Sequence, residues 1–173
     1  MPLSSPGEAA GFRVTMTATP EHFMRAAIRE AESGMRDGRG GPFGCVIVRN
    51  GAIIARGSNQ VTSTNDPTAH AEVTAIRAAC RSLHTFALPD CELYTSCEPC
   101  PMCLAATYWA RIPVLYFGNT RADAAEIGFD DDFIYRQIPL PPEERSLAMR
   151  PLLRDEAQPA FREWQAKADR VRY

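Results

Sequence analysis

Two short motifs limit the folds open to this chain, because both carry metal-ligand residues at the predicted start of a helix. The first is His70-Ala71-Glu72, and the second is Pro99-Cys100-Pro101-Met102-Cys103. Cysteines three residues apart on a helix share one face, so both sulfurs can reach a single ion. Helices that follow strands of one sheet through right-handed connections begin at the same edge of that sheet. The chain is therefore expected to adopt a fold that brings His70 to the cysteine pair.

The sequence around these motifs predicts alternating helices and strands. Thr19-Pro20 is a favoured helix start, and the apolar spacing after it predicts a helix to about Met35. Asn50-Gly51 between two short β-prone runs is the strongest short signal for a hairpin. Strands are expected at 45–48, 52–55, 91–95, 113–117 and 133–138, and further helices at 69–81, 99–110, 122–127 and 160–171. This order predicts an α/β fold, a three-layer α-β-α sandwich with a central mixed five-stranded sheet.

Composition favours one globular domain in an ordinary aqueous compartment. Hydrophobic residues make up 45% of the chain and charged residues 23%. No apolar run approaches the ~20 residues of a membrane span, and no signal-peptide pattern opens the chain, so a cytoplasmic location is expected. The net charge of −2 makes a nucleic-acid partner unlikely. Residues 1–18 are expected to form a flexible extension and 19–173 the domain, with Met16 a second possible start.

The residues of the two motifs predict a catalytic metal site. His70, Cys100 and Cys103 supply three ligands for Zn²⁺, and a catalytic zinc site keeps its fourth position for water. Glu72, two residues after the histidine, is placed to act as a general base on that water. Cys97 is a candidate fourth ligand, which would make the site closed and structural. A redox role for the C-x-x-C pair would leave Glu72 unexplained.

The motifs resemble those of the cytidine-deaminase-like superfamily of zinc enzymes, in which H-x-E is followed by P-C-x-x-C. Within that superfamily the chain looks most like the bacterial guanine deaminases, over residues 20 to 173. The segments that carry the resemblance are Gly40–Gly44, Asn65–Ile76, Leu93–Cys103, Tyr108–Arg111, Asp123–Tyr135 and the terminal Tyr173.

The resemblance implies roles for residues outside the metal motifs. Phe43 would stack on a purine and Asn59 would hydrogen-bond its edge. Asp131, rather than its neighbour Asp130, would help to protonate the leaving amine. Ala71 and Trp109 would lie at the substrate, and Tyr173 would close over it. The resemblance also implies that the C-terminal segment, about 143–173, is exchanged between the subunits of a domain-swapped homodimer.

The implied reaction converts guanine and water into xanthine and ammonia, with one Zn²⁺ per subunit and Glu72 moving the protons. A tRNA-specific adenosine deaminase shares the same metal motifs and is the nearest alternative. A deaminase of another aminated ring, such as cytosine, is a second alternative. A zinc-stabilised binding module without catalysis is the non-enzymatic alternative, and it gives Glu72 no role.

Overall fold

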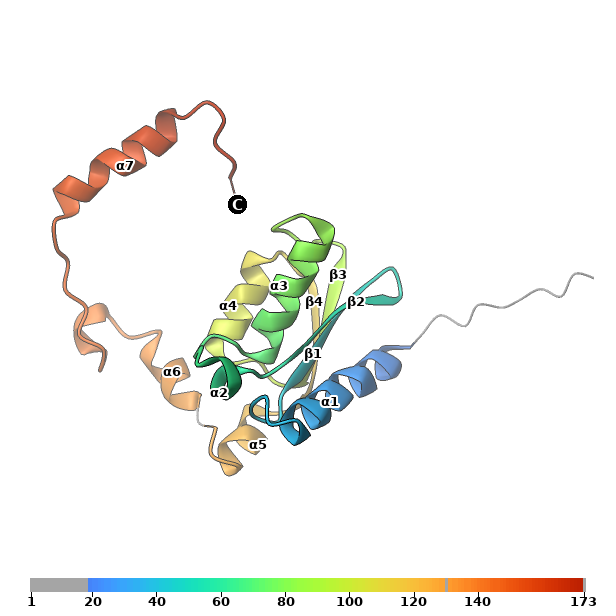
Figure 1. The fold of residues 1–173 in the computed structure, drawn as a ribbon. Helices are drawn as coiled ribbons and strands as arrows, with labels where there is room; N and C mark the ends of the chain where they lie inside the picture. The colour runs from blue at the N-terminus through green and yellow to red at the C-terminus, as the bar shows by residue number, and fades with distance from the viewer. Residues whose placement is uncertain (1–18, 130, 173) are drawn as a thin grey trace, which may run out of the picture.

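The computed structural model describes residues 19–129 and 131–172, and within them a sheet lies between two helical layers (Figure 1). Helix α1 covers one face of the sheet, and helices α3 and α4 cover the other. The strands are β1 (Gly44–Arg49), β2 (Ala52–Ser58), β3 (Cys91–Cys97) and β4 (Val114–Asn119). The helices on its two faces are α1 (Pro20–Arg36), α3 (Ala71–Leu83) and α4 (Pro101–Trp109). The expected α/β fold is confirmed.

The sheet is mixed, but within the described residues it has four strands, in the order β2-β1-β3-β4. β1 is antiparallel to β2 and to β3, whereas β3 and β4 are parallel. The prediction of five strands is therefore wrong. The segment 133–138 was expected as the fifth strand, but residues 133–137 belong to helix α6 (Asp132–Gln137) and Ile138 is its C-cap. Asp132 carries negative charge in the first turn and Arg136 pairs with it one turn later, and both features favour a helix over the segment's β-propensity.

The hairpin between β1 and β2 follows directly from the Asn-Gly pair. Asn50 and Gly51 have φ values of 52° and 73°, as a two-residue turn between antiparallel strands requires. Arg49 and Ala52 face each other across the turn. The sequence prediction of this hairpin is confirmed.

Buried side chains fill the space on both sides of the sheet, because neighbouring residues of a strand face opposite ways. Val46 of β1 packs under α1 with Phe23 and Tyr94. Ile47, the next residue, packs on the other side with Leu93 and the small residues of α3. The two helical layers are thus held by separate apolar clusters that share one sheet.

Helix α3 approaches β2 at a glycine. A Cβ on Gly57 would lie 2.3 Å from the carbonyl oxygen of Ala71 and 2.7 Å from the amide nitrogen of Ala75. Only a residue without a side chain leaves room for this contact. The start of α3, which carries His70 and Glu72, therefore lies directly on the sheet.

The chain after β4 is less tightly packed. It forms α5 (Arg121–Glu126), α6, a 3₁₀ turn (Pro142–Glu144) and α7 (Arg154–Ala166). Earlier in the chain, a further short helix, α2 (Val61–Thr64), lies between β2 and α3. The last helix begins at Arg154 rather than near residue 160, with Pro159 inside it. No residue of α7 is buried, and the helix lies apart from the sheet (Figure 1). No helix in the described part of the chain is long and apolar enough to cross a membrane.

Candidate active site

Three metal-ligand atoms meet where α3 and α4 begin. His70 Nδ1 lies 3.5 Å from the Sγ of Cys100 and 3.5 Å from the Sγ of Cys103. His70 and Cys100 are the N-cap residues of their helices, yet neither side chain caps its own helix. Both are therefore free to point at one place, and the three ligand atoms lie within 4.8 Å of one another. The convergence expected from the sequence is present.

The site stabilises negative charge on the sulfur of Cys100, whereas the hydrogen bond with Cys100 and burial raise the pKa of the Cys103 thiol. Hydrogen bonds from Cys103 and from the His70 ring lower the pKa of the Cys100 thiol to about 4, against the opposing effect of burial. One imidazole and two thiols form a donor set that zinc accepts. Because these are three protein ligands, a fourth position is left for water. The residues present fit a catalytic zinc ion.

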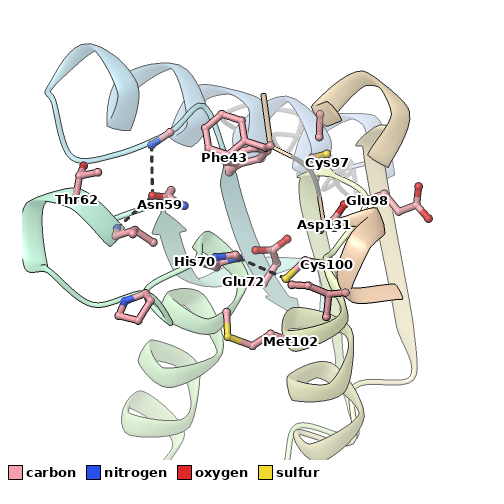
Figure 2. Close-up of a pocket in the computed structure, with 16 residues that line it drawn as sticks. Phe43, Asn59, Thr62, His70, Glu72, Cys97, Glu98, Cys100, Met102 and Asp131 are labelled. Atoms are coloured by element: carbon pink, nitrogen blue, oxygen red, sulfur yellow. Dashed lines mark hydrogen bonds between the residues drawn. The ribbon is translucent and has the colours of Figure 1, made fainter. Parts of the chain in front are cut away.

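Glu72 lies beside this ligand set and is buried, with 6% of its surface exposed. The hydroxyl of Thr95, on β3, donates a hydrogen bond to Glu72 Oε1 at 3.0 Å. Burial is the main cause that raises the pKa of the Glu72 carboxyl. Figure 2 shows its side chain between His70 and Cys100, at the base of a cavity. A carboxylate in this place can exchange protons with anything bound there.

The cavity above the ligands has a volume of about 480 Å³. Phe43, just before β1, forms one wall (Figure 2), and Phe129 meets it edge-on with ring centroids 4.8 Å apart. The cavity is lined by Gly41, Phe43, Asn59, Val61, Thr62, Pro67, His70, Glu72, Cys97, Glu98, Cys100, Met102, Ala124, Phe129, Asp131 and Ile134. Aromatic walls with a few polar groups suit a flat, polar ring.

Two polar side chains of the cavity wall have hydrogen-bonding capacity to spare. Asn59 Oδ1 accepts hydrogen bonds from the amides of Gly41 at 3.3 Å and Val61 at 3.2 Å, so its amide nitrogen remains available as a donor. Asp131 Oδ1 is buried and has no partner in the described part of the chain. Burial, with the nearby Cys100 sulfur, raises the pKa of the Asp131 carboxyl. A buried, unpaired carboxylate oxygen costs free energy unless a ligand supplies a donor.

The structure does not bring every expected residue to the cavity. Ala71 is fully buried at the start of α3 and does not line the cavity. Trp109 is 62% exposed at the far end of α4, away from the metal ligands. Tyr173 and Asp130 lie outside the described residues. The Cys97 thiol donates to the carbonyl of Thr120 at 3.6 Å and does not belong to the ligand cluster.

Sequence reasoning missed residues that complete the site. Thr95, which holds Glu72, lies inside a β-strand, where nothing in the sequence distinguishes it from other strand threonines. Phe129 and Ile134 also line the cavity, and Ile134 lies in the segment that was predicted as a strand but forms helix α6. Phe129 had one usable signal, an aromatic residue between a glycine and an acidic run.

Residues 17–119 match a known family, the cytidine and deoxycytidylate deaminase zinc-binding region. This stretch is more than half of the chain and contains His70, Glu72, Cys100 and Cys103. The chain belongs to this family. As a zinc deaminase it binds one Zn²⁺ through His70, Cys100 and Cys103, and the imidazole and two thiols of these residues suit that ion.

Relatives of this zinc deaminase include guanine deaminase of Bacillus subtilis, 52% identical over 153 residues, which are 88% of this chain and 98% of the relative. The X-ray structure of guanine deaminase from Bacillus subtilis matches with a TM-score of 0.88 and 51% identity, over 90% of this chain and 99% of that one. The tRNA-specific adenosine deaminase of Agrobacterium fabrum is 46% identical over 110 residues, 62% of this chain and 71% of the relative. The tRNA enzyme thus matches a smaller part of the chain.

Proposed function

We propose that this zinc deaminase removes the amino group from C2 of free guanine and produces xanthine and ammonia. The observation that carries the proposal is the buried Oδ1 of Asp131, which has no hydrogen-bond partner among the described residues and lies in the same cavity as Glu72. A leaving amine is a donor that would satisfy this oxygen. The relatives named guanine deaminase, which match nearly the whole chain, support guanine as the base.

The cavity wall offers groups that match a guanine ring. The ring of Phe43 can stack on the flat purine. Asn59 keeps its amide nitrogen as a donor, and guanine presents acceptors at O6 and N7. Because Asn59 Oδ1 is already held by two backbone amides, the donor is fixed before the base arrives. This preorganisation favours a ring with acceptors on the edge opposite its reacting carbon.

Glu72 and Asp131 would move the protons of the reaction. Zinc held by His70, Cys100 and Cys103 would lower the pKa of a water molecule and make it a nucleophile. Glu72 would accept a proton from the attacking water as the water oxygen adds to C2, and would return this proton to the adjacent ring nitrogen. The second proton of the water, now on the C2 hydroxyl, would then pass to the amino group through Glu72 and Asp131. The C–N bond breaks, ammonia leaves and the oxygen at C2 becomes a carbonyl.

The C-terminal segment would close the site of a second subunit. We propose a homodimer in which residues 143–173 are exchanged and Tyr173 covers the base. Phe161 and Trp164 of α7 are 74% and 45% exposed, so this helix lacks a surface to cover its apolar side chains within its own subunit. A second copy would supply that surface. The proposal includes a cytoplasmic location and one catalytic domain over residues 19–173, preceded by a flexible extension.

Release of ammonia from candidate substrates tests the proposed function. Zinc-loaded protein is offered guanine, guanosine, adenine, cytosine, cytidine and an anticodon stem-loop RNA. We expect ammonia from guanine, with xanthine as the product, and no inosine in the RNA. Turnover of cytosine, of adenine or of adenosine in the RNA in place of guanine would overturn the proposal. Tight zinc binding with no turnover of any of these would favour a binding module.

A further inference from the structure

We infer that Tyr135 is a positioning residue that holds the Asp131 carboxylate at the cavity. The inference rests on the proposed function, in which Asp131 moves a proton to the leaving amine. Asp131 comes directly before α6, and its carbonyl accepts hydrogen bonds from the amides of Ile134 at 3.0 Å and Tyr135 at 3.2 Å. Asp131 and the first turn of α6 are therefore one unit, and a contact that fixes α6 also fixes the carboxylate.

The side chain of Tyr135 joins α6 to the loop that carries a metal ligand. Its hydroxyl donates to the carbonyl of Pro99 at 2.9 Å, and Pro99 directly precedes Cys100. The guanidinium of Arg121 lies over the Tyr135 ring, 5.0 Å from its centroid. The amide of Arg121 in turn donates to Glu98 at 3.0 Å, so the ring is held between two connected loops. α6 has six residues and none of them is buried. The contacts of Tyr135 with Pro99 and Arg121 therefore contribute much of what holds the helix in place.

A second contact holds the chain on the other side of Asp131. The ring of Phe129 lies edge-on against Phe43 at an interplanar angle of 90°. A Cβ on Gly41 would come within 2.9 Å of the Phe129 ring, so this ring lies flush against the backbone. Phe129 thus fixes the segment before Asp131, and Tyr135 fixes the segment after it.

Tyr135 is not among the residues that line the cavity, so its hydroxyl acts on the reaction through what it positions. Two groups are candidates, the carboxylate of Asp131 on its own helix and the Cys100 ligand next to Pro99. The geometry favours Asp131. Cys100 is already fixed as the N-cap of a nine-residue helix that packs beside α3, whereas Asp131 Oδ1 has no partner within residues 19–129 and 131–172.

The test is a double-mutant cycle of Tyr135→Phe and Asp131→Asn, measured as kcat and KM for guanine on zinc-loaded protein. Tyr135→Phe removes one hydroxyl and keeps the ring. We expect it to lower kcat about tenfold and to leave KM within about threefold, since the loss is in proton transfer rather than in base binding. In the Asp131→Asn background we expect Tyr135→Phe to lower kcat by less than about a further twofold, because the carboxylate that Tyr135 positions is gone.

Tyr94→Phe is the matched control. The Tyr94 hydroxyl also donates one hydrogen bond, to Glu92 at 2.5 Å, but its ring lies under α1 on the other face of the sheet. We expect kcat within about twofold of the wild type for this variant. An equal loss from Tyr135→Phe with and without Asp131, or a loss of bound zinc in Tyr135→Phe, would overturn the inference in favour of a role at Cys100.

Amide hydrogen exchange tests the inference without a substrate. We expect Tyr135→Phe to speed exchange in residues 131–137 at least about fivefold, while α3 exchanges as in the wild type. If the wild type does not turn over guanine, the proposed function fails but this measurement still decides the positioning. Unchanged exchange in 131–137 would overturn the inference even if guanine turnover is normal.

Discussion

The two parts of this molecule are packed very differently, although both contribute to one cavity. The sheet with α1, α3 and α4 buries Tyr94, Ile47 and Leu93 to within 1% of full burial and carries the metal ligands. Among the described residues that follow β4, Ala124 is the only buried one. The metal ligands therefore lie in the tightly packed part, whereas the closure that we propose would depend on a segment that is largely exposed. Asp131 lies where the two parts meet.

The largest effect is expected at Glu72, in the rigid part. Glu72→Ala removes the group that transfers protons, so kcat for guanine should fall roughly 10³–10⁴-fold. Zinc content should stay at one ion per subunit, because His70, Cys100 and Cys103 hold the ion and Glu72 is not one of the ligands. Stopped-time ammonia release and metal analysis measure the two quantities on the same sample. A loss of kcat smaller than about tenfold would show that Glu72 is not the proton carrier.

A smaller but still large effect is expected where α3 crosses β2. Gly57→Ala places a methyl group 2.3 Å from the carbonyl oxygen of Ala71, and backbone cannot yield as a flexible side chain does. We expect the free energy of unfolding to fall by about 3 kcal/mol, together with weaker zinc binding as His70 moves. Urea unfolding and zinc titration with a chelator measure these changes.

Arg56→Ala, at the neighbouring position, is the control for Gly57→Ala. Arg56 makes a half-exposed salt bridge with Glu30, 3.1 Å long, and points away from α3. Exposed pairs of this kind contribute at most about 1 kcal/mol. If both variants lose similar stability, the close approach at Gly57 does not hold α3.

The rigid part could be predicted from sequence because its signals are local. Thr19-Pro20 begins a helix, Asn50-Gly51 forms a hairpin turn, and the two motifs fall at helix starts, as expected. Each of these signals acts through backbone geometry within a few residues. Right-handed connections then bring the two helix starts together without further information. The convergence of His70, Cys100 and Cys103 needed nothing more.

The second part could not be predicted in the same way, because its conformation depends on contacts distant in sequence. Residues 133–138 begin with an aromatic, a β-branched and a second aromatic residue and so suggest a strand, yet propensity for strands depends on a partner strand. The Tyr135 hydroxyl instead finds the carbonyl of Pro99. The pairing of Thr95 with Glu72 is equally invisible, since a threonine is common in any strand. The metal ligands could therefore be predicted from the sequence, but Thr95 and Tyr135, which contact Glu72 and the Pro99 carbonyl, could not.

The smallest effect in this series is expected at the last residue. Deletion of Tyr173 should leave the unfolding midpoint unchanged, and should lower kcat/KM for guanine about tenfold if this residue excludes water from the cavity. Differential scanning fluorimetry and initial rates measure the two quantities. Unaffected turnover would show that the C-terminus does not close the site.

Mixing of two variants shows whether the closing residue comes from the other subunit. Glu72→Ala subunits keep Tyr173, and subunits that lack Tyr173 keep Glu72, so a mixed dimer with exchanged segments has one complete site. We expect kcat/KM per intact Glu72 to rise severalfold on mixing and slow refolding, towards the wild-type value. Closure within one subunit predicts no gain, because every site then lacks either Glu72 or Tyr173. The outcome decides whether the exposed α7 is an incomplete part of one subunit or a contribution to its neighbour.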